Sequence, residues 1–370
     1  MSHLFSPITL RSITCRNRLW MAPMCQYSAL FDGEEAGRPN EWHTIHYGAR
    51  AHGGAGMIIL EATAVEPTGR ISPFDLMLHR DEQIPSFAAL AHLIEDAGST
   101  PAIQLGHAGR KASCSPSGVP LAPKDGPIGG IGWVPYSPSA IPFTAEHTVP
   151  KVMGPTDLSD VVKAFTQAAR RAVEAGFKAI EIHAAHGYLL HQFLSPVTND
   201  RRDDYGGPLE NRARLALEVT QSVRAQIGED IPLMVRISAT DWIEENPEDK
   251  RRGLSLKDMA QVSAWMKEAG ADLIDVSTGG IVHDAQVPAA PGYQVAAACT
   301  IRQHVDIPVS AVGLILEAPQ AEQVLVTQCA DVVSVGRPLL TDPLLPMAWA
   351  SRLSSDAEVP TQYLRGTPRL

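Results

Sequence analysis

The segment Ala175-Gly-Phe-Lys-Ala-Ile-Glu-Ile-His-Ala-Ala-His-Gly-Tyr188 contains, in one stretch, the unit from which the chain is built. A helical pattern over 158–175 ends at a glycine, the residue that commonly terminates an α-helix. The apolar run at 179–182 follows and predicts a short buried strand. Two histidines and a tyrosine then stand where that strand ends. The segment therefore predicts a helix, a buried strand and a polar site at the mouth of the strand.

The same alternation of short apolar runs and helical patterns recurs along the chain. Strands are predicted at 19–24, 57–64, 102–105, 179–182, 233–237, 273–276, 309–312 and 332–335. Helices are predicted between them, among them 158–175, 209–227, 256–269 and 319–329. Continuous apolar strands are buried on both faces, which is typical of a parallel sheet. Eight such repeats predict an α/β fold, a (β/α)8 TIM barrel with a parallel eight-stranded sheet, as one domain over 1–370.

A doubly wound sheet is the alternative fold, but the first predicted strand lacks the G-x-G-x-x-G motif that such sheets place there. Three connections are long: 108–155, 187–208 and 279–293. Long loops in a compact domain usually carry function, so we expect 108–155 to form a lid-like capping loop over the C-terminal face of the barrel. Residues 355–370 form a C-terminal tail.

The composition narrows the class of partner. The net charge of −10 disfavours nucleic acid or an anionic membrane surface as the main partner. Five cysteines without CxxC or zinc spacing indicate reduced thiols in a cytoplasmic enzyme and predict no metal site. The N-terminus has no signal-peptide pattern, and no apolar stretch approaches a membrane-spanning length.

Polar residues stand at the predicted C-terminal ends of the strands, where a barrel places its chemistry. His183, His186 and Tyr188 suit an oxygen atom whose negative charge grows during a reaction. Arg236 lies in an apolar strand and needs an anionic or strongly polar partner, because an unpaired buried charge is costly. That partner is either a ligand or, in the alternative interpretation, a buried salt bridge to Glu61 or Glu181.

The last two predicted strands end in Gly313 and in Gly336-Arg337, the usual place for the phosphate site of a barrel. Glycine allows close approach of the backbone, and Arg337 supplies charge-assisted donors. A phosphate-bearing ring system laid across the barrel fits these positions, and FMN is the natural candidate. Gln104 can then pair with the pyrimidine edge of the flavin, and Arg236 can stabilise its negative charge after reduction.

With these segments in order, the chain closely resembles the Old Yellow Enzyme family of FMN-dependent ene-reductases, most of all its thermophilic-like subgroup, which includes xenobiotic reductases. The matching segments include Ala22-Pro-Met-Cys-Gln-Tyr27, Gln104-Leu-Gly-His-Ala-Gly-Arg-Lys111, Glu181-Ile-His-Ala-Ala-His-Gly-Tyr188, Asp203-Asp-Tyr-Gly-Gly207 and Val335-Gly-Arg337. Each segment is weak evidence alone, but the ordered set spans nearly the whole chain.

The resemblance implies FMN, reduced by NADPH or NADH and reoxidised by an activated alkene. It implies that His183 and His186 bind the carbonyl or nitro oxygen of the substrate, that hydride passes from flavin N5 to the β-carbon, and that Tyr188 protonates the α-carbon. The positions that match flavin contacts of the family are Pro23, Met24, Cys25, Ala62, Gln104, Arg236, Ser277, Gly313, Gly336 and Arg337.

The resemblance also implies an assembly of subunits. Tyr27 matches a substrate contact of the subgroup, and Arg365 matches an arginine that reaches the active site of the neighbouring subunit. We therefore expect a homodimer or homotetramer in which Arg365 acts in trans. For Cys25 and Arg365 the alternatives are a small buried residue and a solvated tail arginine, respectively.

Two rival functions use the same residues differently. A metal-dependent hydrolase barrel could use the paired histidines as ligands, but the other strand ends offer few ligands and Arg236 would repel a cation. A non-catalytic flavin-binding protein would leave Tyr188 and the two imidazoles unexplained. The sequence therefore favours an NAD(P)H-dependent FMN oxidoreductase.

Overall fold

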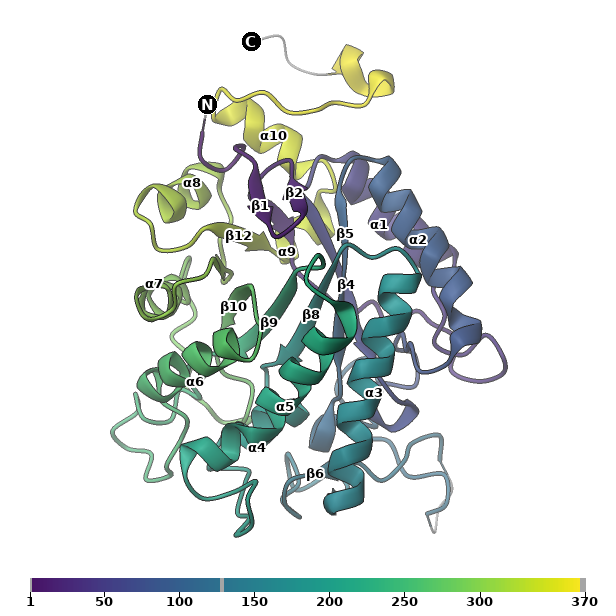
Figure 1. Ribbon diagram of the computed structural model, residues 1–370, viewed down its shortest axis with the longest axis vertical. Coiled ribbons are helices and arrows are strands. Elements are labelled where there is room, and N and C mark those ends of the chain that lie inside the picture. The colour runs from purple at the N-terminus through teal and green to yellow at the C-terminus, as the bar shows by residue number, and fades with distance from the viewer. Residues whose placement is uncertain (1, 127–129, 367–370) are drawn as a thin grey trace.

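A computed structural model describes residues 2–126 and 130–366 of the chain. The parts of the predicted capping loop and tail at 127–129 and 367–370 lie outside the described residues. Eight parallel strands close a barrel in the spatial order β10-β11-β12-β3-β4-β5-β8-β9 (Figure 1). The barrel strands are β3 (Leu19–Met21), β4 (Met57–Ala64), β5 (Thr100–Gly106), β8 (Ala179–Ala184), β9 (Leu233–Ser238), β10 (Leu273–Ser277), β11 (Val309–Ala311) and β12 (Val332–Val335). The predicted TIM barrel is confirmed, and the doubly wound alternative is wrong.

All eight predicted strands are present, and β4 and β12 have the predicted bounds. The largest shift of any one strand end is in the first barrel strand, β3, which was expected to run to residue 24 but ends at Met21. Pro23 lacks an N–H to donate to a neighbouring strand, so the ladder stops before it. Residues 22–27 therefore form a loop at the mouth of the barrel, where their side chains are available to a ligand.

Helices surround the barrel, as Figure 1 shows for α1, α2, α3, α5 and α6. The helices are α1 (Glu41–His52), α2 (Ile84–Asp96), α3 (Pro155–Glu174), α4 (Leu189–Leu194), α5 (Leu209–Ile227), α6 (Leu256–Glu268), α7 (Val295–His304), α8 (Ala318–Val326), α9 (Arg337–Thr341) and α10 (Leu345–Arg352). Short 3₁₀ turns are η1 (Pro67–Gly69), η2 (Asp81–Gln83), η3 (Gly109–Lys111) and η4 (Thr361–Gly366). Glycines with positive φ follow α3 and α6, as the sequence predicts.

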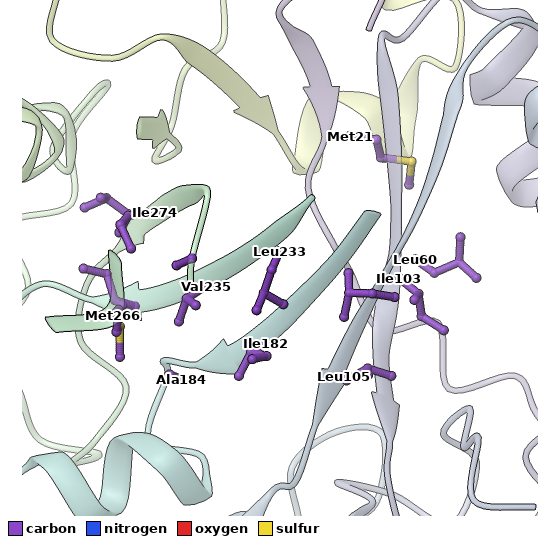
Figure 2. Packing of buried hydrophobic residues seen from close by; sticks show 14 of the residues in the cluster. Met21, Leu60, Ile103, Leu105, Ile182, Ala184, Leu233, Val235, Met266 and Ile274 are labelled. Atoms are coloured by element: carbon purple, nitrogen blue, oxygen red, sulfur yellow. The ribbon is translucent and has the colours of Figure 1, made fainter. Parts of the chain in front are cut away.

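Two apolar layers hold the barrel together. The outer layer packs the strands against the helices and includes Leu60, Ile103, Ile182 and Val235, as Figure 2 shows. The inner layer fills the barrel at the end where the strands begin. Its members are Ile8, Leu10, Cys15, Trp20, Met57, Ile59, Ala102, Ala179, Met234, Leu273 and Val332. The interior is therefore a packed core there, and a ligand has room only toward the C-terminal ends of the strands.

The hairpin of β1 (Ile8–Leu10) and β2 (Ile13–Cys15) supplies part of that inner layer and so covers the N-terminal end of the barrel. At the opposite end lie α4 and the short pair β6 (Tyr136–Ser137) and β7 (Lys151–Val152) (Figure 1). The connection at 187–208 was expected to be a loop, and α4 corrects this. Among the described residues, no helix combines the length and the apolar character needed to cross a bilayer.

Candidate active site

Three aromatic side chains meet where β8 ends. His183 lies on the strand itself, and His186 and Tyr188 lie in the turn before α4. The ring centroids of His183 and His186 are 5.1 Å apart, and those of His183 and Tyr188 are 4.9 Å apart, both pairs nearly perpendicular. The structure therefore gathers the three residues that the sequence singled out, with His183 between the other two.

The turn that carries His186 has an uncommon backbone. His186 has a φ of +55° and Gly187 a φ of +73°, in the left-handed region. A Cβ atom on Gly187 would lie 2.1 Å from the carbonyl oxygen of Gly280, so only glycine fits. The Lys111 Nζ holds the turn in place by donating to the carbonyl oxygens of His186, at 2.9 Å, and Gly280, at 3.1 Å.

Both imidazoles are neutral at physiological pH. Burial lowers the pKa of His183 and of His186 well below the usual value, and the nearby Arg236 charge lowers both further. The backbone N–H of Ala185 donates to Nδ1 of His183 at 3.3 Å, which places the His183 proton on Nε2. His183 is therefore a neutral donor whose Nε2–H is available to a bound oxygen.

The imidazole of His186 already makes a hydrogen bond within the chain. Its Nε2 lies 2.7 Å from the Oγ of Ser277, and that hydroxyl donates to Oε1 of Gln294 at 3.3 Å. Since the Ser277 proton is directed to Gln294, the hydroxyl accepts from the imidazole. The backbone N–H of His186 donates to the Oγ of Ser238 at 2.9 Å. Burial raises the pKa of Tyr188 well above the usual value, so its phenol keeps its proton.

Arg236 lies beside the histidines, because β9 pairs it in register with His183 on one side and Asp275 on the other. Its Nε is 3.3 Å from Oδ2 of Asp275, but the angle does not make a hydrogen bond. The alternative of a salt bridge to Glu61 or Glu181 is wrong, because the ion pair forms with Asp275. Glu61 accepts instead from the Tyr47 hydroxyl and the Gln26 backbone N–H, at 3.1 Å and 2.7 Å.

Several buried polar atoms around Arg236 have no hydrogen-bond partner in the described chain. They are Nε of Arg236, both carboxylate oxygens of Asp275 and Oε2 of Glu181. The other Glu181 oxygen accepts from Nε2 of Gln104 at 2.7 Å. Burial, together with the Asp275 charge, raises the pKa of Glu181 to about 8. Because unpaired buried polar groups are costly, this layer has the character of a ligand-binding surface.

A cavity with about 490 Å³ of empty space opens above this layer. Its lining includes Arg236, Ser277, Gly313, Gly336 and Arg337, from the ends of β9 to β12. Gly313 has a φ of +126°, and a Cβ atom there would lie 2.7 Å from the Gln294 Nε2. Two guanidinium groups beside the backbone of two glycines fit the phosphate and the anionic ring of FMN.

The loop at 22–27 lies at the edge of this cavity, since a Cβ on Gly336 would lie 3.4 Å from Sδ of Met24. The Cys25 thiol and the Tyr27 hydroxyl lie close enough for each to influence the pKa of the other. Burial raises the pKa of Cys25 well above its usual value, so the thiol is protonated. Cys25 is thus a neutral polar group rather than a thiolate.

A smaller cavity, with Ala62, His183 and Tyr188 in its lining, adjoins the histidines. His186 lies between the two linings, because its ring packs against His183 of the smaller cavity and its Nε2 bonds to Ser277 of the larger one. The two cavities are therefore adjacent parts of one site. Arg365 is the predicted residue that the chain does not bring here: it lies exposed in η4, in the tail at the other end of the molecule (Figure 1).

Sequence reasoning missed Ser238, Asp275 and Gln294. A signal existed for two of them. Asp275 is a charged residue inside an apolar strand, like Arg236. Ser238 stands two residues after Arg236, and alternate residues of a strand point to the same side. Gln294 lies after a long connection, and its role depends on a contact that the sequence does not reveal.

The fold and the site define a class: a barrel oxidoreductase with a basic cavity, large enough for part of a flavin, at the ends of its last strands. The model of the NADH:flavin oxidoreductase / NADH oxidase family matches residues 3–356, and the chain belongs to this family. The resemblance to the Old Yellow Enzyme family is thereby confirmed, as are the FMN cofactor and the nicotinamide reductant. The enzyme is an FMN-dependent NAD(P)H oxidoreductase, and nothing in the comparisons supports a metal-dependent hydrolase.

The chain is similar over its length to characterised relatives. It is 43% identical to an NADPH dehydrogenase of Bacillus subtilis and 46% identical to one of Geobacillus thermodenitrificans, over 98% of each chain in both cases. The structure of morphinone reductase matches with a TM-score of 0.76 at 26% identity, over 97% of this chain and 91% of that one. A 2-naphthoyl-CoA reductase matches with a TM-score of 0.83 at 25% identity, but this chain covers only 52% of its length.

Proposed function

We propose that this enzyme reduces activated alkenes, in which a carbon–carbon double bond is conjugated to a carbonyl or nitro group. The observation that carries the proposal is the meeting of two neutral imidazoles and a protonated phenol beside a basic cavity. NADPH is the expected reductant, because the relatives of similar length are named NADPH dehydrogenases.

Different residues of the lining would hold different parts of FMN. Arg337 and the backbone at Gly313 and Gly336 would hold the phosphate, and Arg236 and Gln104 would contact the ring. Met24, Pro23, Cys25 and Ala62 would cover the remaining edge. When bound and reduced, FMN supplies a hydride to the β-carbon of the alkene.

His183 and His186 would bind the substrate oxygen. A neutral imidazole donates its Nε2–H to that oxygen, and the charge that grows there during reduction strengthens the bond. Electron withdrawal toward the oxygen leaves the β-carbon electrophilic. The Tyr188 O–H bond would break as its proton passes to the α-carbon, which completes the saturated product.

We further propose a homodimer or homotetramer in which Arg365 enters the site of a neighbour, with Tyr27 as a substrate contact. On α1, Trp42 and Ile45 are both more than half exposed, and neighbouring exposed apolar side chains of this kind are typical of an interaction surface. The Trp42 Nε1 donates to Oε1 of Gln26, next to Tyr27, so the exposed face adjoins the site. η4, which carries Arg365, lies at the opposite end of its own barrel, which favours a contact of Arg365 with the site of another subunit (Figure 1). We place the enzyme in the cytoplasm, which its odd number of scattered cysteines supports.

An anaerobic titration tests the proposed reaction. The purified protein should be yellow, lose its visible absorbance with NADPH, and regain it when cyclohexenone, a maleimide or a nitroalkene is added. Recovery should occur with one equivalent of alkene and yield the saturated product. A flavin that NADPH bleaches but that none of these alkenes reoxidises would refute alkene reduction while leaving the oxidoreductase class intact.

A further inference from the structure

Asp75 is a buried carboxyl group that the proposed reaction leaves unused. It follows η1 in the connection after β4, and only 2% of its surface is exposed. Its Oδ2 accepts from the backbone N–H groups of Ile71, at 2.6 Å, and Ser72, at 3.2 Å. Its Oδ1 has no hydrogen-bond partner, although a buried oxygen of this kind is normally bonded.

The free oxygen belongs to the small cavity of the active site. Asp75, Tyr188 and His183 all line that cavity, and Ala62 and Gly106 form part of its wall. The cavity is narrow and has room for about one water molecule. No direct hydrogen bond joins Asp75 to Tyr188, so a proton would pass between them through a bridging water.

The surroundings of Asp75 determine whether it carries a proton. Burial, together with the Glu61 charge, raises its pKa to about 8, against the backbone hydrogen bonds and the Arg70 charge. The Arg70 guanidinium donates to the carbonyl oxygens of Pro67 and Pro73, and so is not bonded to the carboxyl group. The other titratable groups near Asp75 are Cys25, Tyr27, Tyr188 and Cys114, together with His107 and His183 in the cavity wall. At neutral pH Asp75 is therefore a carboxylic acid with an O–H to give.

Tyr188 needs a neighbouring proton donor. Once its proton is lost, a buried phenolate remains, and the burial that raises the pKa of Tyr188 makes that charge costly. The neutral His183 has a single ring proton, which is directed to the substrate. Lys111 lies 5.2 Å from the centroid of the Tyr188 ring, over its face, and donates to two carbonyl oxygens. Among the residues that line this cavity, Asp75 therefore has the proton that no other contact accounts for, and Lys111 is outside the lining.

We propose that Asp75 supplies the proton that replaces the one lost by Tyr188, a role that rests on the alkene reduction proposed above. The Asp75 O–H bond breaks, and its proton passes through the bridging water to the phenolate oxygen, where the O–H bond of Tyr188 re-forms. The carboxylate that remains takes a proton from solvent before the next turnover. One solvent proton is consumed for each alkene, and no electrons move in this step.

The variant Asp75→Asn separates this role from a structural one. Its side-chain amide oxygen can still accept from Ile71 and Ser72, but the group cannot supply the proton. In a single anaerobic turnover we expect the flavin to reoxidise at the wild-type rate, because Tyr188 begins protonated. Near-ultraviolet absorbance of a phenolate should then appear transiently in Asp75→Asn and not in the wild type. Steady-state turnover should fall about 10²-fold.

The pH dependence gives a second readout. The difference spectrum of wild type minus Asp75→Asn should contain the infrared carbonyl band of a protonated carboxylic acid at pH 7, and that band should titrate near pH 8. Glu181, whose pKa is also raised to about 8, contributes to both spectra and cancels in the difference. Wild-type turnover should fall above pH 8 toward that of Asp75→Asn. The control is Glu66→Gln, which changes a neighbouring carboxylate, paired with His107, outside the cavity lining. It should keep the wild-type band and pH profile.

The outcomes distinguish the two proposals. If Tyr188→Phe reduces alkenes at the wild-type rate, the proton step of the proposed function fails, and the role of Asp75 with it. If Tyr188→Phe is slow but Asp75→Asn shows neither a phenolate transient nor a changed pH profile, the role of Asp75 alone is refuted. A wild-type Asp75 that is ionised at pH 7 would refute it as well.

Discussion

Replacing His183 and His186 by alanine, one at a time, should slow alkene reduction to different extents. Removing one preorganised donor to a developing oxyanion typically lowers the rate by about 10²–10³. For His183 we expect the whole of this loss, because its Nε2–H is set by the Ala185 hydrogen bond and is bound to no other group in the described chain. His186 differs, because its Nε2–H already donates to Ser277.

The hydrogen bond between His186 and Ser277 reduces the expected effect of His186→Ala on the rate. A substrate oxygen must take the place of the Ser277 hydroxyl, and a typical hydrogen bond contributes about 1 kcal/mol net. That amount corresponds to about a fivefold smaller effect on the rate. His186→Ala should therefore slow the reaction by about 20- to 200-fold, and His183→Ala by about 10²–10³.

The assay is the anaerobic reoxidation of reduced flavin by cyclohexenone, followed by visible absorbance in a stopped-flow instrument. Flavin content is measured first, so that loss of FMN is not mistaken for loss of rate. His92→Ala, on the exposed side of α2, is the matched control and should react like the wild type. Wild-type rates in both active-site variants would refute the role of the imidazoles. A larger effect for His186 than for His183 would refute the assignment of the free donor.

Three further predictions concern the cofactor and the assembly. Arg236→Ala should lower the free energy of unfolding by about 3–5 kcal/mol and weaken FMN binding, because it leaves Asp275 as an uncompensated buried charge; a loss of about 1 kcal/mol or less in denaturant titrations would contradict this. Cys25→Ala should shift the flavin midpoint potential, because its buried, protonated thiol follows Met24 in the loop at the edge of the cofactor cavity. An unchanged potential would leave Cys25 a packing residue. Arg365→Ala should raise KM with little change in the oligomeric state, and truncation after Val359 should do the same or dissociate the oligomer; unchanged kinetics and sedimentation in both would refute the trans contact.

Much of the fold could be predicted because its signals are local. A barrel strand is buried on both faces, so each appears in the sequence as a short apolar run such as 57–64. The glycines after α3 and α6 mark where those helices end. The three-residue strands of the β1–β2 hairpin, by contrast, are too short to show a period, and their burial depends on the barrel interior. The six-residue α4 was missed for the same reason.

The sequence predicted which residues form the candidate site, but it did not predict which of them pair with one another. Polar residues at the ends of apolar strands indicated His183 and Arg236, because burying such groups needs a reason. Which carboxylate pairs with Arg236 depends on the register between β9 and β10, and the sequence does not contain that register. Asp75 lies in a connection without a regular pattern, and only the packing of that connection against residues that follow β5 brings it into the same cavity as Tyr188.

A crystal structure of the oxidised enzyme with cyclohexenone tests the central claim most directly. We expect FMN with its phosphate beside Arg337 and its ring beside Arg236, and the ketone oxygen within hydrogen-bond distance of Nε2 of His183. We also expect the Tyr188 hydroxyl to face the α-carbon. Flavin bound elsewhere on the barrel, or a ketone oxygen directed away from both imidazoles, would contradict the account.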